Sequence, residues 1–83
     1  MSNRIPTATK IQAIDVHGFA LAADFPGWGA ENYKDFFVEV PAGLTGTVVS
    51  TESHGMAPFT RLVIKWENGS RSAGVDPREV RAI

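Results

Sequence analysis

The alternation of apolar and polar residues predicts β-strands along much of the chain, most clearly in TRLVIKW, residues 60–66. This run is followed by Asn68-Gly69, the preferred pair for a two-residue type I′ hairpin, because both residues tolerate positive φ. SRSAGV, residues 70–75, is then the short returning strand. The sequence therefore predicts a β-hairpin in the second half of the chain.

Two further strands are predicted before this hairpin. TKIQAIDV, residues 9–16, alternates with Ile11 and Ala13 on one face, and GTVVST, residues 46–51, is β-branched almost throughout. The second of these strands follows Gly43, which indicates a tight turn at its start.

The segment DPREV predicts one helical turn near the end of the chain. Asp76 is a preferred N-cap residue, Pro77 suits the first helical position, and Glu79 stands where it can reach back to the cap. Only about one turn fits before the chain ends, so we expect a 3-10 turn followed by a last strand at residues 80–83.

The predicted order is strand, long first loop, strand, medium loop, strand, tight hairpin, strand, one helical turn and final strand. With GLTGTVV, VIKWENGS and DPREV, this order resembles an SH3-like small β-barrel. The resemblance implies an all-β fold of about five strands, with a long first loop at about residues 17–45 and one short 3-10 turn before the last strand. Small bacterial and phage proteins with a "G-x-V…V-x-W-x-N-G" pattern are similar. We expect a tail at residues 1–8 and one domain at 9–83.

Proteins of this fold serve as peptide-binding modules, as KOW-type nucleic-acid contacts, as subunits of complexes and, in one plasmid-encoded dihydrofolate reductase, as an enzyme. The chain lacks the ALYDY sequence of eukaryotic SH3 domains and the basic loops of KOW motifs. In the strand after the hairpin it has SRSAGV where the reductase has a Gln-Ile-Tyr segment. The resemblance therefore implies a fold and leaves the function open.

Composition limits the function classes. Eighty-three residues without cysteine are enough for a single modest core and exclude disulfides and thiolate sites. The chain has no signal-like apolar run near its start and no apolar stretch long enough to span a membrane, so we expect a soluble cytoplasmic protein without membrane contact. The net charge of −1 disfavours nucleic acid as a partner.

The long first loop contains the richest candidate site. Six of the eight aromatic residues lie between residues 19 and 37, in a segment that has a net charge of −3 from residue 17 to residue 41. We expect Phe19, Phe36 and Phe37 to plug the open end of a barrel. Trp28, on a turn tip between two glycines, and Tyr33 are the candidates for display. With them we group the nearby acids Asp24, Glu31 and Asp35, as a surface that would receive Arg, Lys or Pro from a partner.

Other candidate sites have less support. Arg61, Lys65 and Arg71 could form a basic face for phosphates, with Arg71 across the hairpin from Lys65. His17 and His54 could ligate a metal with Asp15 or Glu52, but no ligand spacing supports it. No nucleophile motif or cofactor signature is present, so we expect no catalytic residues, cofactor or metal.

Three hypotheses follow. The leading one is a non-enzymatic module that binds a protein partner, a second copy of itself included, through the acidic, aromatic first loop. The second is a KOW-like nucleic-acid or ribonucleoprotein contact through the Arg61, Lys65 and Arg71 face. The third is a small enzyme whose site is shared between the subunits of an oligomer.

Overall fold

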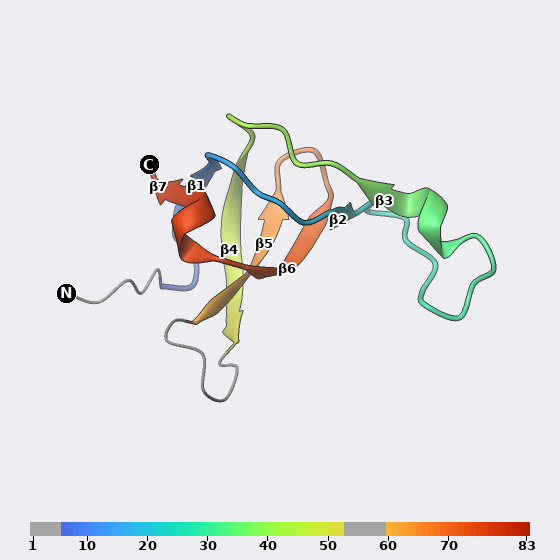
Figure 1. Cartoon of the computed structure of the whole chain (residues 1–83). Helices are drawn as coiled ribbons and strands as arrows, with labels where there is room; N and C mark the ends of the chain where they lie inside the picture. Colours follow the sequence, from blue (N-terminus) through green and yellow to red (C-terminus); the bar gives the residue numbers. More distant parts are fainter. Residues whose placement is uncertain (1–5, 53–59) are drawn as a thin grey trace.

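The structure, a computed structural model, describes residues 6–52 and 60–83, which form one seven-stranded antiparallel sheet (Figure 1). Its strands and 3-10 segments are β1 (Lys10–Ala13), β2 (Ala20–Leu21), η1 (Tyr33–Phe36), β3 (Phe37–Val38), β4 (Thr45–Glu52), β5 (Arg61–Trp66), β6 (Arg71–Val75), η2 (Pro77–Glu79) and β7 (Val80–Ala82). The all-β prediction is confirmed.

The strands are arranged in the order β3-β2-β6-β5-β4-β1-β7. Among the described residues, β3 and β7 each have a hydrogen-bonded neighbour on one side only, so the sheet is open. The prediction of about five strands is too low, because the first loop contains the short pair β2 and β3. These strands are two residues long, too short to produce an alternating sequence pattern.

The alternation of apolar and polar residues in the sequence matches the alternation of buried and exposed residues in the strands. In β5, Leu62, Ile64 and Trp66 are each no more than 1% exposed, whereas Lys65 between them is exposed. The indole Nε1 of Trp66 donates a hydrogen bond of 2.8 Å to the buried Oγ of Ser72 on β6, so the polar atom of the largest core residue is satisfied. The buried apolar residues are Ile11, Ala13, Ala20, Val40, Val48, Leu62, Ile64, Trp66, Val75 and Val80.

The hairpin between β5 and β6 is present, but its predicted turn type is wrong. Trp66 N donates to Ser70 O over 2.8 Å and Gly69 N donates to Trp66 O over 3.0 Å, so the loop has three residues. Gly69 has φ +90°, whereas Asn68 does not have positive φ. This is the three-residue hairpin loop that ends in a left-handed glycine. The side chain of Asn68 accepts a hydrogen bond from Ser70 N, which gives it a role outside the left-handed region.

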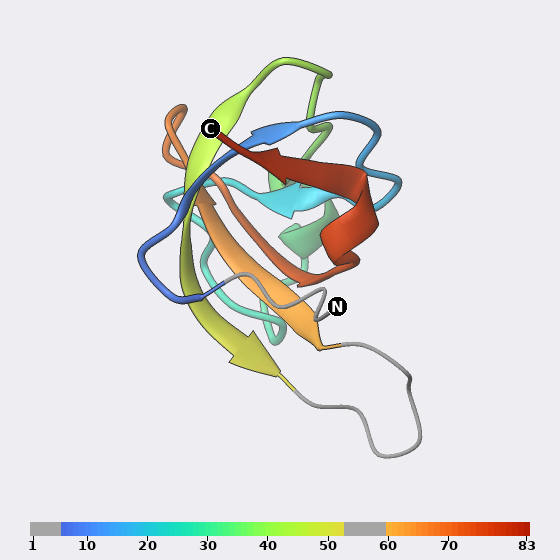
Figure 2. The same cartoon turned by 90° about the vertical axis from the view of Figure 1, so that its left-hand side faces the viewer.

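The predicted helical turn before the last strand is confirmed. Asp76 Oδ1 accepts from Arg78 N, and Glu79 Oε1 accepts from Asp76 N, which completes the capping box of η2. β7 then pairs with β1 (Figure 2), and the register places Ala13 opposite Val80. The C-terminal strand is therefore joined to the N-terminal strand and forms one edge of the sheet.

Candidate binding surface

The most unusual part of the structure is the arm, which we define as residues 19–38. It comprises β2, a turn-rich segment, η1 and β3. Its far end projects from the main sheet, by which we mean the other five strands, β6-β5-β4-β1-β7 (Figure 1). β2 and β3 pair through Ala20 with Val38 and Leu21 with Phe37. The arm joins the main sheet through one register pair, Leu21 with Arg71 on β6.

Local turns shape the far end of the arm. Phe25 N donates to Ala22 O over 3.0 Å, and Ala30 N donates to Gly27 O over 3.3 Å, so the chain reverses direction in short steps. Gly27 has φ +114°, a conformation that residues with a Cβ rarely adopt. The Pro26-Gly27 turn therefore fixes the position from which the side chain of Trp28 projects.

The aromatic side chains of the arm pack against one another. The ring centroid of Trp28 lies 5.1 Å from that of Phe25, 5.7 Å from that of Tyr33 and 5.9 Å from that of Phe37. The rings of Phe19 and Phe37 stack at 6.1 Å. These centroid distances fall in the range in which aromatic pairs attract. Trp28 is therefore the centre of a cluster built within the arm.

None of these aromatic residues belongs to the buried core. Phe19 is 61% exposed and Trp28 is 66% exposed, whereas Phe36 and Phe37 are half-buried. The expectation that Phe19 plugs the end of a barrel is wrong, and Phe37 packs on Phe19, Trp28 and Tyr33. The physical reason is that β2 and β3 carry these residues beyond the main sheet, where the strands of the core do not reach.

Two adjoining depressions lie where the arm meets β5 and β6. The aromatic pocket has a volume of about 220 Å³ and is lined by Phe19, Leu21, Trp28, Phe37, Arg71 and Ala73. The basic pocket has a volume of about 380 Å³ and is lined by Leu21, Ala22, Ala23, Phe25, Lys65, Gly69 and Arg71. Leu21 and Arg71 line both, so the two pockets meet at the single pairing that joins the arm to the sheet.

The structure brings together residues that the sequence assigned to two different sites. Arg71, predicted for the basic face, lines the same pocket as Trp28, predicted for the aromatic surface. Lys65 and Arg71 are register partners, as expected for residues across the hairpin. Arg61 lies at the other end of β5, opposite Glu52, and lines neither pocket.

The acids predicted to accompany Trp28 are placed differently. Asp24, Glu31 and Asp35 are all exposed, but none of them lines the aromatic pocket or the basic pocket. Tyr33 is half-buried, and the Nζ of its neighbour Lys34 lies 5.9 Å from its ring centroid. Of the residues proposed for partner binding, Trp28 and Tyr33 are in contact with each other, and the charge that reaches the aromatic pocket is positive.

Sequence reasoning missed the exposure of Phe19 and missed the proximity of Phe19 and Phe37 to Arg71. This proximity results from the pairing of Leu21 with Arg71, which are fifty positions apart in the chain. A two-residue strand carries no periodicity that could have revealed this pairing.

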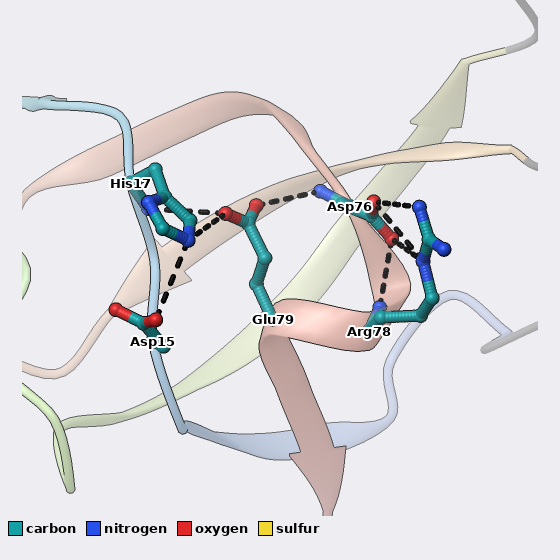
Figure 3. A network of polar contacts seen from close by, with 5 residues as sticks. All are labelled: Asp15, His17, Asp76, Arg78 and Glu79. Atoms are coloured by element: carbon teal, nitrogen blue, oxygen red, sulfur yellow. Dashed lines mark hydrogen bonds and ion pairs between the residues drawn. The ribbon is translucent and has the colours of Figure 1, made fainter.

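A network of polar contacts lies at the other end of the sheet, away from the arm (Figure 3). His17 N donates to Glu79 Oε2 over 3.1 Å, and His17 Nε2 lies 3.4 Å from Asp15 Oδ2 and 3.8 Å from Glu79 Oε2. Glu79 therefore joins η2 to the start of the first loop. Hydrogen bonds from Arg78 to the Asp76 carboxylate, the shortest of them 2.8 Å, hold the pKa of Asp76 below its ordinary value.

This network does not form a metal site. Within residues 6–52 and 60–83, no group of three or more His, Asp or Glu side chains is placed to hold a metal ion. His54, the other candidate ligand, lies outside the described residues. No helix in the part of the chain that the structure describes is long and apolar enough to cross a membrane.

No family model matches this chain, and no curated protein or solved structure matches it either.

Proposed function

We propose that this protein is a non-enzymatic binding module that captures a segment of a partner protein between its arm and its main sheet. The observation that carries the proposal is the aromatic pocket, in which Trp28 and Phe19 remain about two-thirds exposed beside half-buried Phe37. Clustered exposed apolar side chains mark interaction sites far more often than isolated ones do. Partly exposed tryptophans that become buried on binding are common hot spots.

The burial pattern also supports this proposal. Among the residues that the structure describes, ten apolar residues form the core, and no aromatic residue of the arm is one of them. The aromatic cluster therefore makes little contribution to the burial that holds the main sheet together, and binding is the function that it fits best. A partner that covers the exposed rings removes apolar surface from water, and this favours binding.

We also propose that the scaffold is an SH3-like small barrel that is left open between β3 and β7. The observed order of elements supports it: strand, long loop, strand, strand, hairpin, strand, 3-10 turn and final strand, with β2, η1 and β3 folded inside the long loop. In this fold the long first loop provides a surface that can differ between proteins while the sheet stays the same.

The test is a selection of random twelve-residue peptides, displayed on phage, against the immobilised protein. We expect peptides that are enriched on the unaltered protein and lost on Trp28→Ala. Ile83→Ala is the matched control, because Ile83 is 62% exposed but lies just beyond β7, at the other edge of the sheet. Enrichment that is equal on the unaltered protein and on Trp28→Ala, or no enrichment at all on a protein that does not self-associate, would contradict the proposal.

Sedimentation velocity of the protein alone shows whether a second copy is the partner. Association that Trp28→Ala abolishes and Ile83→Ala preserves would identify the second copy as the occupant of the aromatic pocket.

A further inference from the structure

We propose that the captured segment is an extended peptide with a carboxylate side chain next to a large apolar one, and that Lys65 and Arg71 bind the carboxylate. This inference rests on the proposed function and names its ligand class. It reverses the ligand charge expected from the sequence, in which an acidic loop would receive Arg, Lys or Pro. The reason for this reversal is that the charged residues lining the aromatic pocket and the basic pocket are Lys65 and Arg71.

The first observation is that the two pockets continue into a third depression. This third depression, of about 390 Å³, is lined by Thr47, Val49, Lys65, Trp66, Glu67 and Gly69. It shares Lys65 and Gly69 with the basic pocket, as the basic pocket shares Leu21 and Arg71 with the aromatic pocket. The three depressions adjoin in series, from the arm across β6 and β5 to β4, which suits an extended ligand.

The second observation is the charge at the middle of this series. Lys65 and Arg71 are register partners on adjacent strands, and both are exposed. Neither has an ion pair or side-chain hydrogen bond to another residue of the ranges 6–52 and 60–83. Side chains of directly opposed residues start about 5 Å apart, so the two cations can act on one carboxylate. Arg is well suited to bind it through two hydrogen bonds.

The third observation is that no acid among residues 6–52 and 60–83 lines the aromatic pocket or the basic pocket. A peptide with Lys or Arg at this position would bring a third positive charge to Lys65 and Arg71. A carboxylate would instead neutralise them, while its apolar neighbour enters the aromatic pocket between Phe19, Trp28 and Phe37. At about 220 Å³ that pocket is smaller than most sites for whole small molecules, which are about 300 to 1,000 Å³, and it suits one side chain.

Aromatic rings beside cations also bind single-stranded nucleic acids, but the charge of this protein disfavours that ligand. The net charge is −1, and the arm carries exposed Asp24, Glu31 and Asp35. A polyphosphate backbone would bring many negative charges near these acids, whereas Lys65 and Arg71 are the only cations of the described part of the chain that line the two pockets. A peptide brings its negative charge to one point and matches the two cations there.

The experiment continues from the peptide selection. We expect the Trp28-dependent peptides to share Asp or Glu within about two residues of Phe, Trp, Leu or Ile, the spacing over which side chains of an extended peptide reach neighbouring pockets. One such peptide, labelled with fluorescein, is titrated with the protein at about 0.15 M salt. Its acid-to-amide variant (Glu to Gln, or Asp to Asn) should bind about tenfold more weakly or worse, because a charge-assisted pair is lost.

Charge reversal in the protein supplies the decisive comparison. Arg71→Glu and Lys65→Glu should each lower the affinity for the acidic peptide about tenfold or more. Arg71→Glu should also raise the affinity for a peptide in which Lys replaces the acid. Lys10→Glu is the matched control, because it makes the same charge change at an exposed residue of β1 that lines none of the three depressions. All three positions are exposed, so the melting temperatures should stay close to that of the unaltered protein.

The outcomes separate the inference from the proposed function. Trp28-dependent peptides rich in Lys, Arg or Pro, or acidic peptides that are insensitive to Arg71→Glu, would overturn the inference and leave the proposed function standing. Absence of Trp28-dependent peptides on a protein that sediments as a monomer would overturn both. Binding of a 20-nucleotide oligothymidylate that is tighter than binding of the peptides and depends on Lys65 and Arg71 would also overturn both. Self-association that occupies the aromatic pocket and excludes peptides would overturn the inference alone.

Discussion

Replacement of each of the two tryptophans tests the division between core and binding surface. Trp28 is about one-third buried, and a Trp side chain can bury up to about 250 Å², so about 80 Å² is removed from water. At about 25 cal/mol per Å², Trp28→Ala should lower the free energy of unfolding by about 2 kcal/mol at most. Compactness of the unfolded chain reduces this to between about 1 and 2 kcal/mol.

Trp66 is 1% exposed, and its loss has two costs. Replacement of a buried Trp by Ala typically costs about 3 to 5 kcal/mol through lost burial and the remaining cavity. The buried Oγ of Ser72 would also lose its 2.8 Å hydrogen bond from the indole. Because a domain of this size is stable by about 4 to 12 kcal/mol, Trp66→Ala should remove a large part of that stability. Trp66→Phe keeps most of the packing and is the variant to measure if Trp66→Ala does not fold.

Urea denaturation followed by far-UV circular dichroism gives the free energies. Since the chain has only two tryptophans, each variant also leaves one fluorescent reporter. In Trp28→Ala the remaining Trp66 should be protected from acrylamide quenching, and in Trp66→Phe the remaining Trp28 should be readily quenched. A loss of about 3 kcal/mol or more in Trp28→Ala would show that the arm belongs to the core, and the reasoning behind the aromatic pocket would be refuted.

Three further predictions concern the hairpin, the last turn and nucleic acid. Gly69→Val should lower the free energy of unfolding by about 1 to 3 kcal/mol, because valine cannot adopt φ +90° cheaply; an unchanged thermal midpoint would contradict this. Asp76→Asn keeps an oxygen that can cap Arg78 N but removes the charge that pairs with the Arg78 guanidinium, so it should lower stability by up to about 1 kcal/mol at neutral pH. Because the pKa of Asp76 lies below its ordinary value of 3.8, the contribution of its charge is present above that value and is lost as the pH falls through the lowered pKa. Denaturation curves of Asp76→Asn and the unaltered protein should therefore converge in acid, and a constant difference would disprove the role of the charge. Duplex DNA should bind more weakly than about 1 μM at about 0.15 M salt, and a tighter dissociation constant by fluorescence anisotropy would contradict the charge argument.

The sequence by itself determined the elements whose signals are local. The alternation of Leu62, Ile64 and Trp66 predicted both a strand and its buried face, because successive side chains of a strand point to opposite sides. Asp76, Pro77 and Glu79 predicted the 3-10 turn, because all the partners of a capping box lie within four residues of one another. The hairpin position also followed from Gly69, although the loop length did not, since two-residue and three-residue loops both accept a left-handed glycine there.

Only the tertiary structure decided where the aromatic residues lie. Phe19 and Phe37 have the composition of core residues, yet the short β2 and β3 carry them out on the arm, and Trp28 packs there with Phe25 and Tyr33. The proximity of Arg71 to Trp28 depends on one strand pairing between residues fifty positions apart. Such a contact is set by the path of the whole chain and by competition among all possible pairings, so no pattern near either residue records it. The charge of the ligand that we propose follows from that contact, which is why the acidic loop alone pointed to the opposite one.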